Sequence, residues 1–183
     1  MAVTEDSSRL KGAALDAWRG YLQSHAAILR ELDAELVAAH GMTTRDYEVL
    51  LYLAQAEDHS LPMSKLAERT MLTRSGITRL VDGLVQCGLI ERVACATDAR
   101  VSYAHLTAAG YERLRLAGRT HLAGVERLFL THFSEEELGT LSELLGKLPG
   151  AHLAGACAVD GEGGAARDGA CAVEGDASTA GTL

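Results

Sequence analysis

Residues 73–100, TRSGITRLVDGLVQCGLIERVACATDAR, determine how the rest of this chain is interpreted. Their first half predicts an amphipathic helix, because apolar side chains recur at the i, i+3, i+4 and i+7 spacing of one helical face. Thr73 is expected to cap the start of this helix and Gly88 to end it. Residues 89–95 and 101–106 then predict two short strands of a hairpin. A basic helix followed by a hairpin with an arginine at its tip is suited to contacting two grooves of DNA.

The helix face opposite the apolar stripe is polar and basic. Its residues are Arg74, Ser75, Thr78 and Asp82, with Arg79 on the flank. Arginine is the side chain best suited to guanine, and recognition helices contact bases with residues near their N-terminus. Asparagine, the usual reader of adenine, is absent from the chain. Base reading is therefore expected to depend on arginine and hydroxyl contacts together with DNA shape.

The net charge of the 183-residue chain is −8, which argues at first against a nucleic-acid partner. The charge is unevenly distributed, however. Residues 60–106 carry six basic and four acidic side chains, and they form the only segment with a positive balance. The local field matters more than the total charge for attracting a polyanion, so DNA remains the expected partner.

Long helices are predicted on both sides of this basic segment. Residues 13–40 carry apolar side chains in heptad-like steps, which predicts a helix roughly 40 Å long. Such a helix is too long for one small domain to cover, so it is expected to pack against other long helices, in the same chain or a second one. Two further helices are predicted at 108–131 and 135–148, the second with a capping box beginning at Ser134. Thr44, Ser64 and Thr107 are expected to cap the remaining helices.

These patterns predict a mainly α protein with a small β wing. The fold class is a winged helix-turn-helix at about 44–106, with long terminal helices at about 13–40 and 108–148 forming a dimerisation domain. The whole domain is expected to span 12–149. Residues 1–11 are expected to be disordered, as is the acidic tail at 150–183, which is rich in alanine and glycine.

Five short motifs, in this order and spacing, resemble the MarR family of bacterial transcription regulators. They are Met63-Ser64-Lys65-Leu66-Ala67, Arg74-Ser75-Gly76-Ile77-Thr78-Arg79-Leu80-Val81-Asp82, Cys87-Gly88-Leu89-Ile90-Glu91-Arg92, Asp98-Ala99-Arg100 and Leu106-Thr107-Ala108-Ala109-Gly110. The resemblance covers about 13–148. It implies a homodimer that binds a palindromic operator in double-stranded DNA, usually as a repressor released by a small ligand or by oxidation.

The resemblance also implies roles for individual residues. The residues expected to contact DNA or support that contact are Ser64, Lys65, Thr73, Arg74, Ser75, Thr78, Arg79, Arg92, Asp98 and Arg100. Arg100, braced by Asp98, would enter the minor groove, and Arg92 would support the wing or bind a phosphate. The wing departs from the family pattern because it carries few basic residues, and the acidic tail lies outside that pattern.

An aromatic and histidine cluster is the candidate site for a small-molecule effector. Its members are Trp18, Tyr21, His25, Tyr47 and His121. Effectors of this family often sit where the long terminal helices meet the DNA-binding lobe, and such side chains suit an aromatic acid. The alternative is that Trp18 and His25 are only core and dimer residues.

Two other modes of regulation remain as alternatives. A redox-responsive regulator would use Cys95, on a wing strand, as its reactive thiol. A metal-responsive regulator needs several converging ligands, yet His121 and His132 lie roughly 16 Å apart along one helix. No metal site within one chain is predicted, while a site shared between subunits stays open.

Other classes of protein are not supported by the sequence. No dinucleotide, phosphate-loop or hydrolase motif occurs, so neither an enzyme nor a cofactor is expected. No apolar run approaches the ~20 residues of a membrane span, and the polar N-terminus does not resemble a signal peptide. The four cysteines form no CxxC pair, which favours a reducing, cytoplasmic location.

Overall fold

The computed structural model describes residues 11–95 and 101–150, and the chain divides into two compact units. Among the described residues, one unit comprises 11–48 and 112–150, and the other comprises 49–95 and 101–111. The terminal segments that the sequence predicts to be disordered lie outside the described residues, apart from positions 11 and 150. No helix in the described part of the chain is both long enough and apolar enough to cross a membrane.

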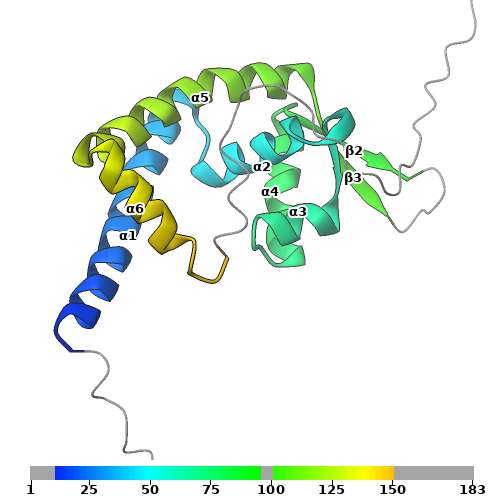
Figure 1. The fold of residues 1–183 in the computed structure, drawn as a ribbon. Coiled ribbons are helices and arrows are strands. Elements are labelled where there is room, and N and C mark those ends of the chain that lie inside the picture. Colours follow the sequence, from blue (N-terminus) through cyan, green and yellow to red (C-terminus); the bar gives the residue numbers. More distant parts are fainter. Residues whose placement is uncertain (1–10, 96–100, 151–183) are drawn as a thin grey trace, which may run out of the picture. The chain divides into compact units, whose positions relative to one another are not determined.

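The first unit is entirely helical. It contains α1 (Ala13–His40), α6 (Glu135–Leu145), most of α5 (Ala108–Leu128) and the start of α2 (Thr44–Ala54). α5 packs against the C-terminal part of α1 (Figure 1), where Arg127 pairs with Glu35 and Thr120 hydrogen-bonds to the ring of His40 at 2.8 Å. The sequence predicts helices at 108–131 and 135–148, but α5 and α6 end three residues earlier, at Leu128 and Leu145. A 3₁₀ turn, Leu130–His132, lies between them.

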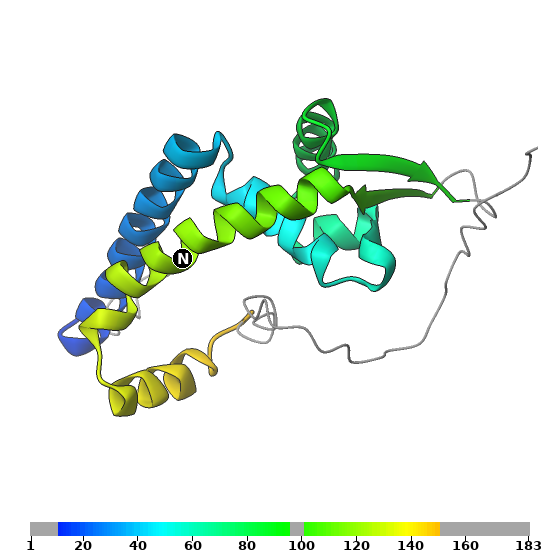
Figure 2. The ribbon, with the colours of Figure 1, turned by 90° about the horizontal axis from the view of Figure 1, so that it is seen from above.

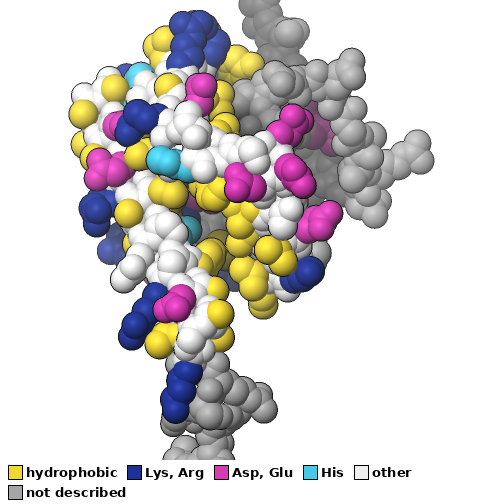
Figure 3. Space-filling model, turned by 60° about the vertical axis from the view of Figure 1, so that its left-hand side comes forward, with side chains coloured by type: hydrophobic (Ala, Val, Ile, Leu, Met, Phe, Trp, Pro, Cys, Tyr) yellow, Lys and Arg dark blue, Asp and Glu magenta, His cyan; other side chains and the backbone are white. Residues whose placement is uncertain are grey.

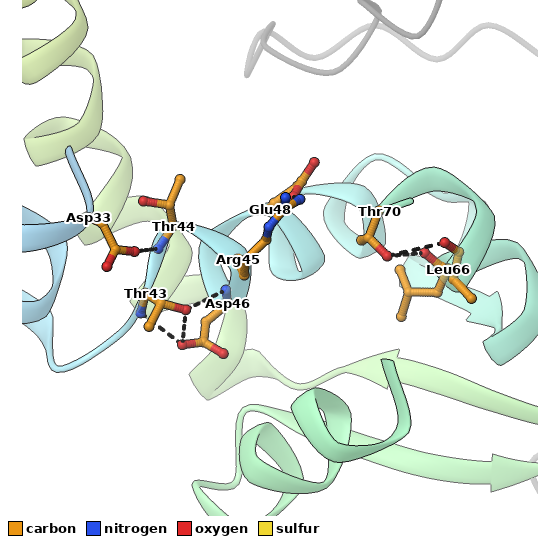
Figure 4. A network of polar contacts seen from close by, with 9 residues as sticks. Asp33, Thr43, Thr44, Arg45, Asp46, Glu48, Leu66 and Thr70 are labelled. Atoms are coloured by element: carbon orange, nitrogen blue, oxygen red, sulfur yellow. Dashed lines mark hydrogen bonds and ion pairs between the residues drawn. The ribbon is translucent and has the colours of Figure 1, made fainter. Parts of the chain in front are cut away.

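Two caps of the first unit illustrate how local sequence fixes helix ends. Ser134 and Glu137 form the predicted capping box, and hydrogen bonds from Ser134 lower the pKa of the Glu137 carboxyl. The prediction that Thr44 caps α2 is wrong. Thr43 takes that position, accepting a hydrogen bond from the Asp46 amide at 3.2 Å, while Asp33 accepts one from the Thr44 amide (Figure 4).

The second unit is a winged helix-turn-helix, which confirms the predicted fold class. Its elements after α2 are η1 (Glu57–His59), β1 (Ser60–Pro62), α3 (Met63–Arg69), α4 (Arg74–Gln86), β2 (Ile90–Ala94) and β3 (Ser102–Leu106). The three strands form an antiparallel sheet in the order β1-β3-β2, and β2 and β3 continue as a two-stranded ribbon (Figures 1 and 2). This ribbon is the wing.

The core of the second unit is built from the predicted apolar stripe of α4. Ile77, Val81 and Leu84 are buried, as is Leu66 of α3. In the sheet, Ile90 pairs with Leu106, and both side chains face the core. Each such large side chain contributes about 1.5–3 kcal/mol by leaving water, so the buried stripe fixes the rotation of α4 about its axis.

The joints of the second unit are closely packed. Thr107 caps α5 by accepting from the Gly110 amide at 3.0 Å, and its hydroxyl donates to the Gly88 carbonyl at 2.8 Å. A Cβ on Gly110 would meet the Leu89 carbonyl oxygen at 2.1 Å, so only glycine fits there. The predicted cap at Ser64 is wrong, because α3 already begins after Pro62 and no side chain caps it.

Candidate nucleic-acid interface

Side-chain hydrogen bonds of Thr73 cap the N-terminus of α4. The Thr73 hydroxyl accepts a hydrogen bond from the Gly76 amide at 3.1 Å, which satisfies a free donor of the first turn. Ser75 Oγ lies 3.2 Å from Thr73 Oγ1, with either hydroxyl able to donate. Since Ile77 and Val81 are buried on the opposite side, the polar face of α4 points outward.

This polar face forms a basic surface with an open hollow. The side chains that line the hollow are Thr73, Arg74, Ser75, Thr78 and Arg79. Both arginines are exposed, and neither pairs with an acidic side chain of the described residues. Their charges are thus available to an anionic partner, as the sequence predicts.

Arg92 joins the wing to the recognition helix. Its guanidinium donates to Asp82 Oδ1 at 2.8 Å and to the Thr78 carbonyl at 3.4 Å. These two contacts link β2 to α4, and both predicted roles of Arg92, support of the wing and phosphate binding, stay predictions. An exposed ion pair of this kind is worth only about 0–1 kcal/mol, so its main effect is to orient β2 against α4. The sequence placed Asp82 on this face without assigning it a role, and the structure shows that it pairs with Arg92.

The other predicted DNA contacts lie on α3 or outside the described residues. Ser64 and Lys65 are exposed at the start of α3, and Lys65 pairs with Glu68 at 3.2 Å. Asp98 and Arg100 fall within residues 96–100, outside the described part of the chain. Minor-groove reading by the wing tip therefore stays a prediction.

The five candidate effector residues form two groups rather than one cluster. Along α1, Trp18 stacks with Tyr21 at 6.3 Å between ring centroids, and Tyr21 with His25 at 6.0 Å; all three are exposed. Separately, the buried ring of Tyr47 lies 4.7 Å from that of His121. The reason for the division is that α5 crosses α1 near Leu36 and His40, roughly 27 Å along the helix from Trp18.

The Tyr47–His121 pair lies beside unsatisfied polar atoms. The Nδ1 atom of His121 is buried without a hydrogen-bond partner among the described residues, and so is the hydroxyl oxygen of Thr44, one turn before Tyr47. Burial lowers the pKa of the His121 imidazole, which favours its neutral form. Unpaired buried polar atoms are costly, and a small polar ligand would satisfy them.

The described residues give little support to the two alternative modes of regulation, by a metal ion or by oxidation. Among residues 11–95 and 101–150, no three histidine, cysteine or acidic side chains come close enough to hold a metal ion. Cys95, the candidate reactive thiol, is disulfide-bonded and only 8% exposed, so it is not a free thiol in this structure.

Similarity to known proteins agrees with this fold and surface. A model of the MarR family matches residues 40–101. The regulator PrsX of Escherichia coli is 33% identical over 123 residues, which cover 66% of this chain and 71% of PrsX. The chain belongs to the MarR family. The HTH-type transcriptional repressor YetL of Bacillus subtilis is similar as well, at 31% identity over 61% of this chain and 66% of YetL.

Solved structures of MarR proteins show the same architecture. The regulator AbsC from Streptomyces coelicolor aligns with a TM-score of 0.70 at 31% identity, covering 74% of this chain and 91% of AbsC. Sco3205 from the same organism, solved in complex with DNA, aligns with a TM-score of 0.72 at 28% identity, over 77% and 88% of the two chains. The chain is therefore a MarR-type transcriptional regulator and not an enzyme.

Proposed function

We propose that this MarR protein binds a specific DNA sequence through α4 and acts as a cytoplasmic homodimeric repressor released by a small molecule. The observation that supports DNA binding most directly is the outward face of α4, where Arg74 and Arg79 line one hollow and have no acidic partner within residues 11–95 and 101–150. The DNA complex of the similar regulator Sco3205 supports the same assignment.

In this proposal α4 enters the major groove. Arg74 and Arg79 donate to guanine O6 and N7 or to nearby phosphates, and the Thr73 cap keeps the first turn rigid as it approaches the bases. Arg92 keeps its contact with Asp82, so that β2 and the wing follow the helix onto the DNA. Arg100, braced by Asp98, reads the adjoining minor groove.

A homodimer is proposed because the first unit leaves much apolar surface open. Of the thirteen large hydrophobic side chains exposed in the described residues, eleven lie in this unit; the two in the second unit are Met71 and Tyr111. Hydrophobic side chains are open to solvent on the side shown in Figure 3. Exposed apolar surface of this extent marks an interface, and a two-fold dimer matches a palindromic operator.

The effector is proposed to bind beside Tyr47 and His121. The unpaired Thr44 hydroxyl and His121 Nδ1 supply hydrogen-bonding atoms, and the Tyr47 ring supplies an aromatic surface. A neutral imidazole and a hydroxyl suit a small polar or aromatic molecule. Trp18, Tyr21 and His25 belong to this site only if a second copy brings them to it.

Alanine in place of Arg74 or Arg79 tests the DNA-binding surface. Each change should weaken binding to a selected operator by about 1–3 kcal/mol, the value of one bidentate base contact, and binding to random DNA much less. The measurement is fluorescence anisotropy with both duplexes at one salt concentration. Arg119→Ala, at an exposed arginine of the first unit, is the matched control. Equal losses on both duplexes for Arg74→Ala and Arg79→Ala would show that α4 does not read bases.

A further inference from the structure

Thr78 lies on the polar face of α4 with its hydroxyl proton already used. Its Oγ1 donates to the Arg74 carbonyl at 2.8 Å, one helical turn earlier. A carbonyl oxygen can only accept, so the direction of this hydrogen bond is unambiguous. The Thr78 carbonyl is in turn approached by Arg92 from the wing, and both contacts restrict the orientation of this residue.

Thr78 can therefore offer only two kinds of contact to DNA. Its oxygen retains the capacity to accept, and its methyl group remains apolar, but it has no proton left to donate. Guanine O6 and N7, adenine N7 and thymine O4 are all acceptors, and Thr78 would leave each of them unsatisfied. Ser75 differs, because either hydroxyl of the Ser75–Thr73 pair can be the donor.

We propose that Thr78 is a specificity-determining residue that selects an A·T pair in each operator half-site. An A·T pair presents the two features that complement it, the adenine amino donor and the thymine methyl group. Cytosine also presents an amino donor, so the methyl contact is what separates A·T from G·C. With Arg74 and Arg79 beside it in the hollow, the expected half-site has guanine next to this pair. The inference rests on the proposed function, since it assumes that α4 enters the major groove.

The experiment removes the thymine methyl group from the DNA and the Thr78 methyl group from the protein, first separately and then together. The full-length protein first selects its preferred duplex from random DNA, and each thymine of a half-site is then replaced by uracil, which lacks only that methyl. For the wild-type protein, one such replacement should weaken binding about 4-fold, the value of one apolar carbon taken from water. Binding of the same duplexes is measured for Thr78→Ser and Thr78→Val.

The serine variant keeps the hydroxyl and loses the methyl, so uracil at the critical position should cause no further loss. The valine variant keeps a methyl, so the difference between thymine and uracil should persist. Thr140→Ser is the matched control, because Thr140 makes the same hydrogen bond to a preceding carbonyl, at 3.1 Å, on α6. It should leave the uracil effect at its wild-type size. Circular dichroism checks that each variant is folded.

Two results would overturn the inference. One is a set of uracil penalties that is the same in Thr78→Ser as in the wild type at every thymine. The other is a selected half-site without any thymine. A selection that enriches no sequence at all would instead contradict the proposed function, so the two failures are distinguishable.

Discussion

His121 is a half-buried histidine whose neutral state the fold favours. Burial lowers its pKa below the ordinary value of 6.5, so below about pH 6.5 the unfolded chain binds more protons than the folded one. The contribution of His121 to the free energy of unfolding should therefore be constant above that pH, fall as the pH decreases from about 6.5 toward the folded-state pKa, and level off below it. Urea unfolding between pH 5 and 8 measures this slope.

His121→Gln removes the titrating group and should flatten this part of the profile. His132→Gln, at an exposed histidine of the same unit, is the matched control. If the His121→Gln protein keeps the full slope between pH 6.5 and 5, the destabilisation in acid has another origin.

Single caps were predictable from sequence only where the spacing was unambiguous. Ser134 is followed by glutamate at the third position, and Thr73 directly precedes a strong apolar stripe, so both caps were correctly predicted. Thr43 and Thr44 are adjacent, and the acidic residue that selects between them is Asp46, three positions after Thr43. That spacing was available in the sequence and identifies Thr43 as the cap.

The start of α5 packs closely enough that Gly110 has no room for a Cβ atom. It lies in the first turn of α5, and a Cβ there would lie 2.1 Å from the Leu89 carbonyl oxygen and 2.7 Å from Leu106. Gly110→Ala should destabilise the protein by about 1–3 kcal/mol, because backbone must move to admit the methyl group. Thermal or urea unfolding measures the loss.

Gly83 provides the matched control for this change. It lies inside α4 in the same unit, and a Cβ there would meet nothing within 4 Å. Gly83→Ala should stabilise the protein by about 0.5–1 kcal/mol through helix propensity alone. A Gly110→Ala protein as stable as the wild type would mean that the backbone at Leu89 does not press against the first turn of α5.

The elements themselves were largely predictable, whereas the contacts between them were not. Apolar periodicity located α4 and both wing strands to within a residue or two, since a buried stripe must recur at the period of its element. The ion pair between Arg92 and Asp82 depends on how the hairpin turns back along the helix. Sequence spacing does not contain that information.

The apolar seam of α1 runs along the helix, but the described residues cover it at only one end. Leu32 and Leu36 are buried, whereas Leu22 and Leu29 are 44% and 39% exposed. The sequence predicted the seam and could not show which part the chain itself covers. It also could not show that Trp18 and His121 lie far apart, because that follows from where α5 crosses α1.

A protein carrying Leu22→Glu and Leu29→Glu should lose its dimer. Each leucine removed from an interface costs about 1.5–3 kcal/mol, and the added charges would have to be buried. Sedimentation velocity should show a monomer, and operator affinity should fall because two linked half-sites are no longer bound together. Met71→Glu, at a position 72% exposed in the second unit, should leave the dimer intact. A stable dimer of the double variant would place the interface elsewhere.

Trp18 is the only tryptophan in the chain, and it is 51% exposed on the uncovered part of α1. The intrinsic fluorescence of this protein therefore comes from a single indole on the face proposed to meet a second copy. Its emission should shift to shorter wavelength as that face is covered, while events at α4 leave it unchanged. The chain thus carries its own optical reporter of assembly, which can follow how dilution or an added effector changes the dimer without any label.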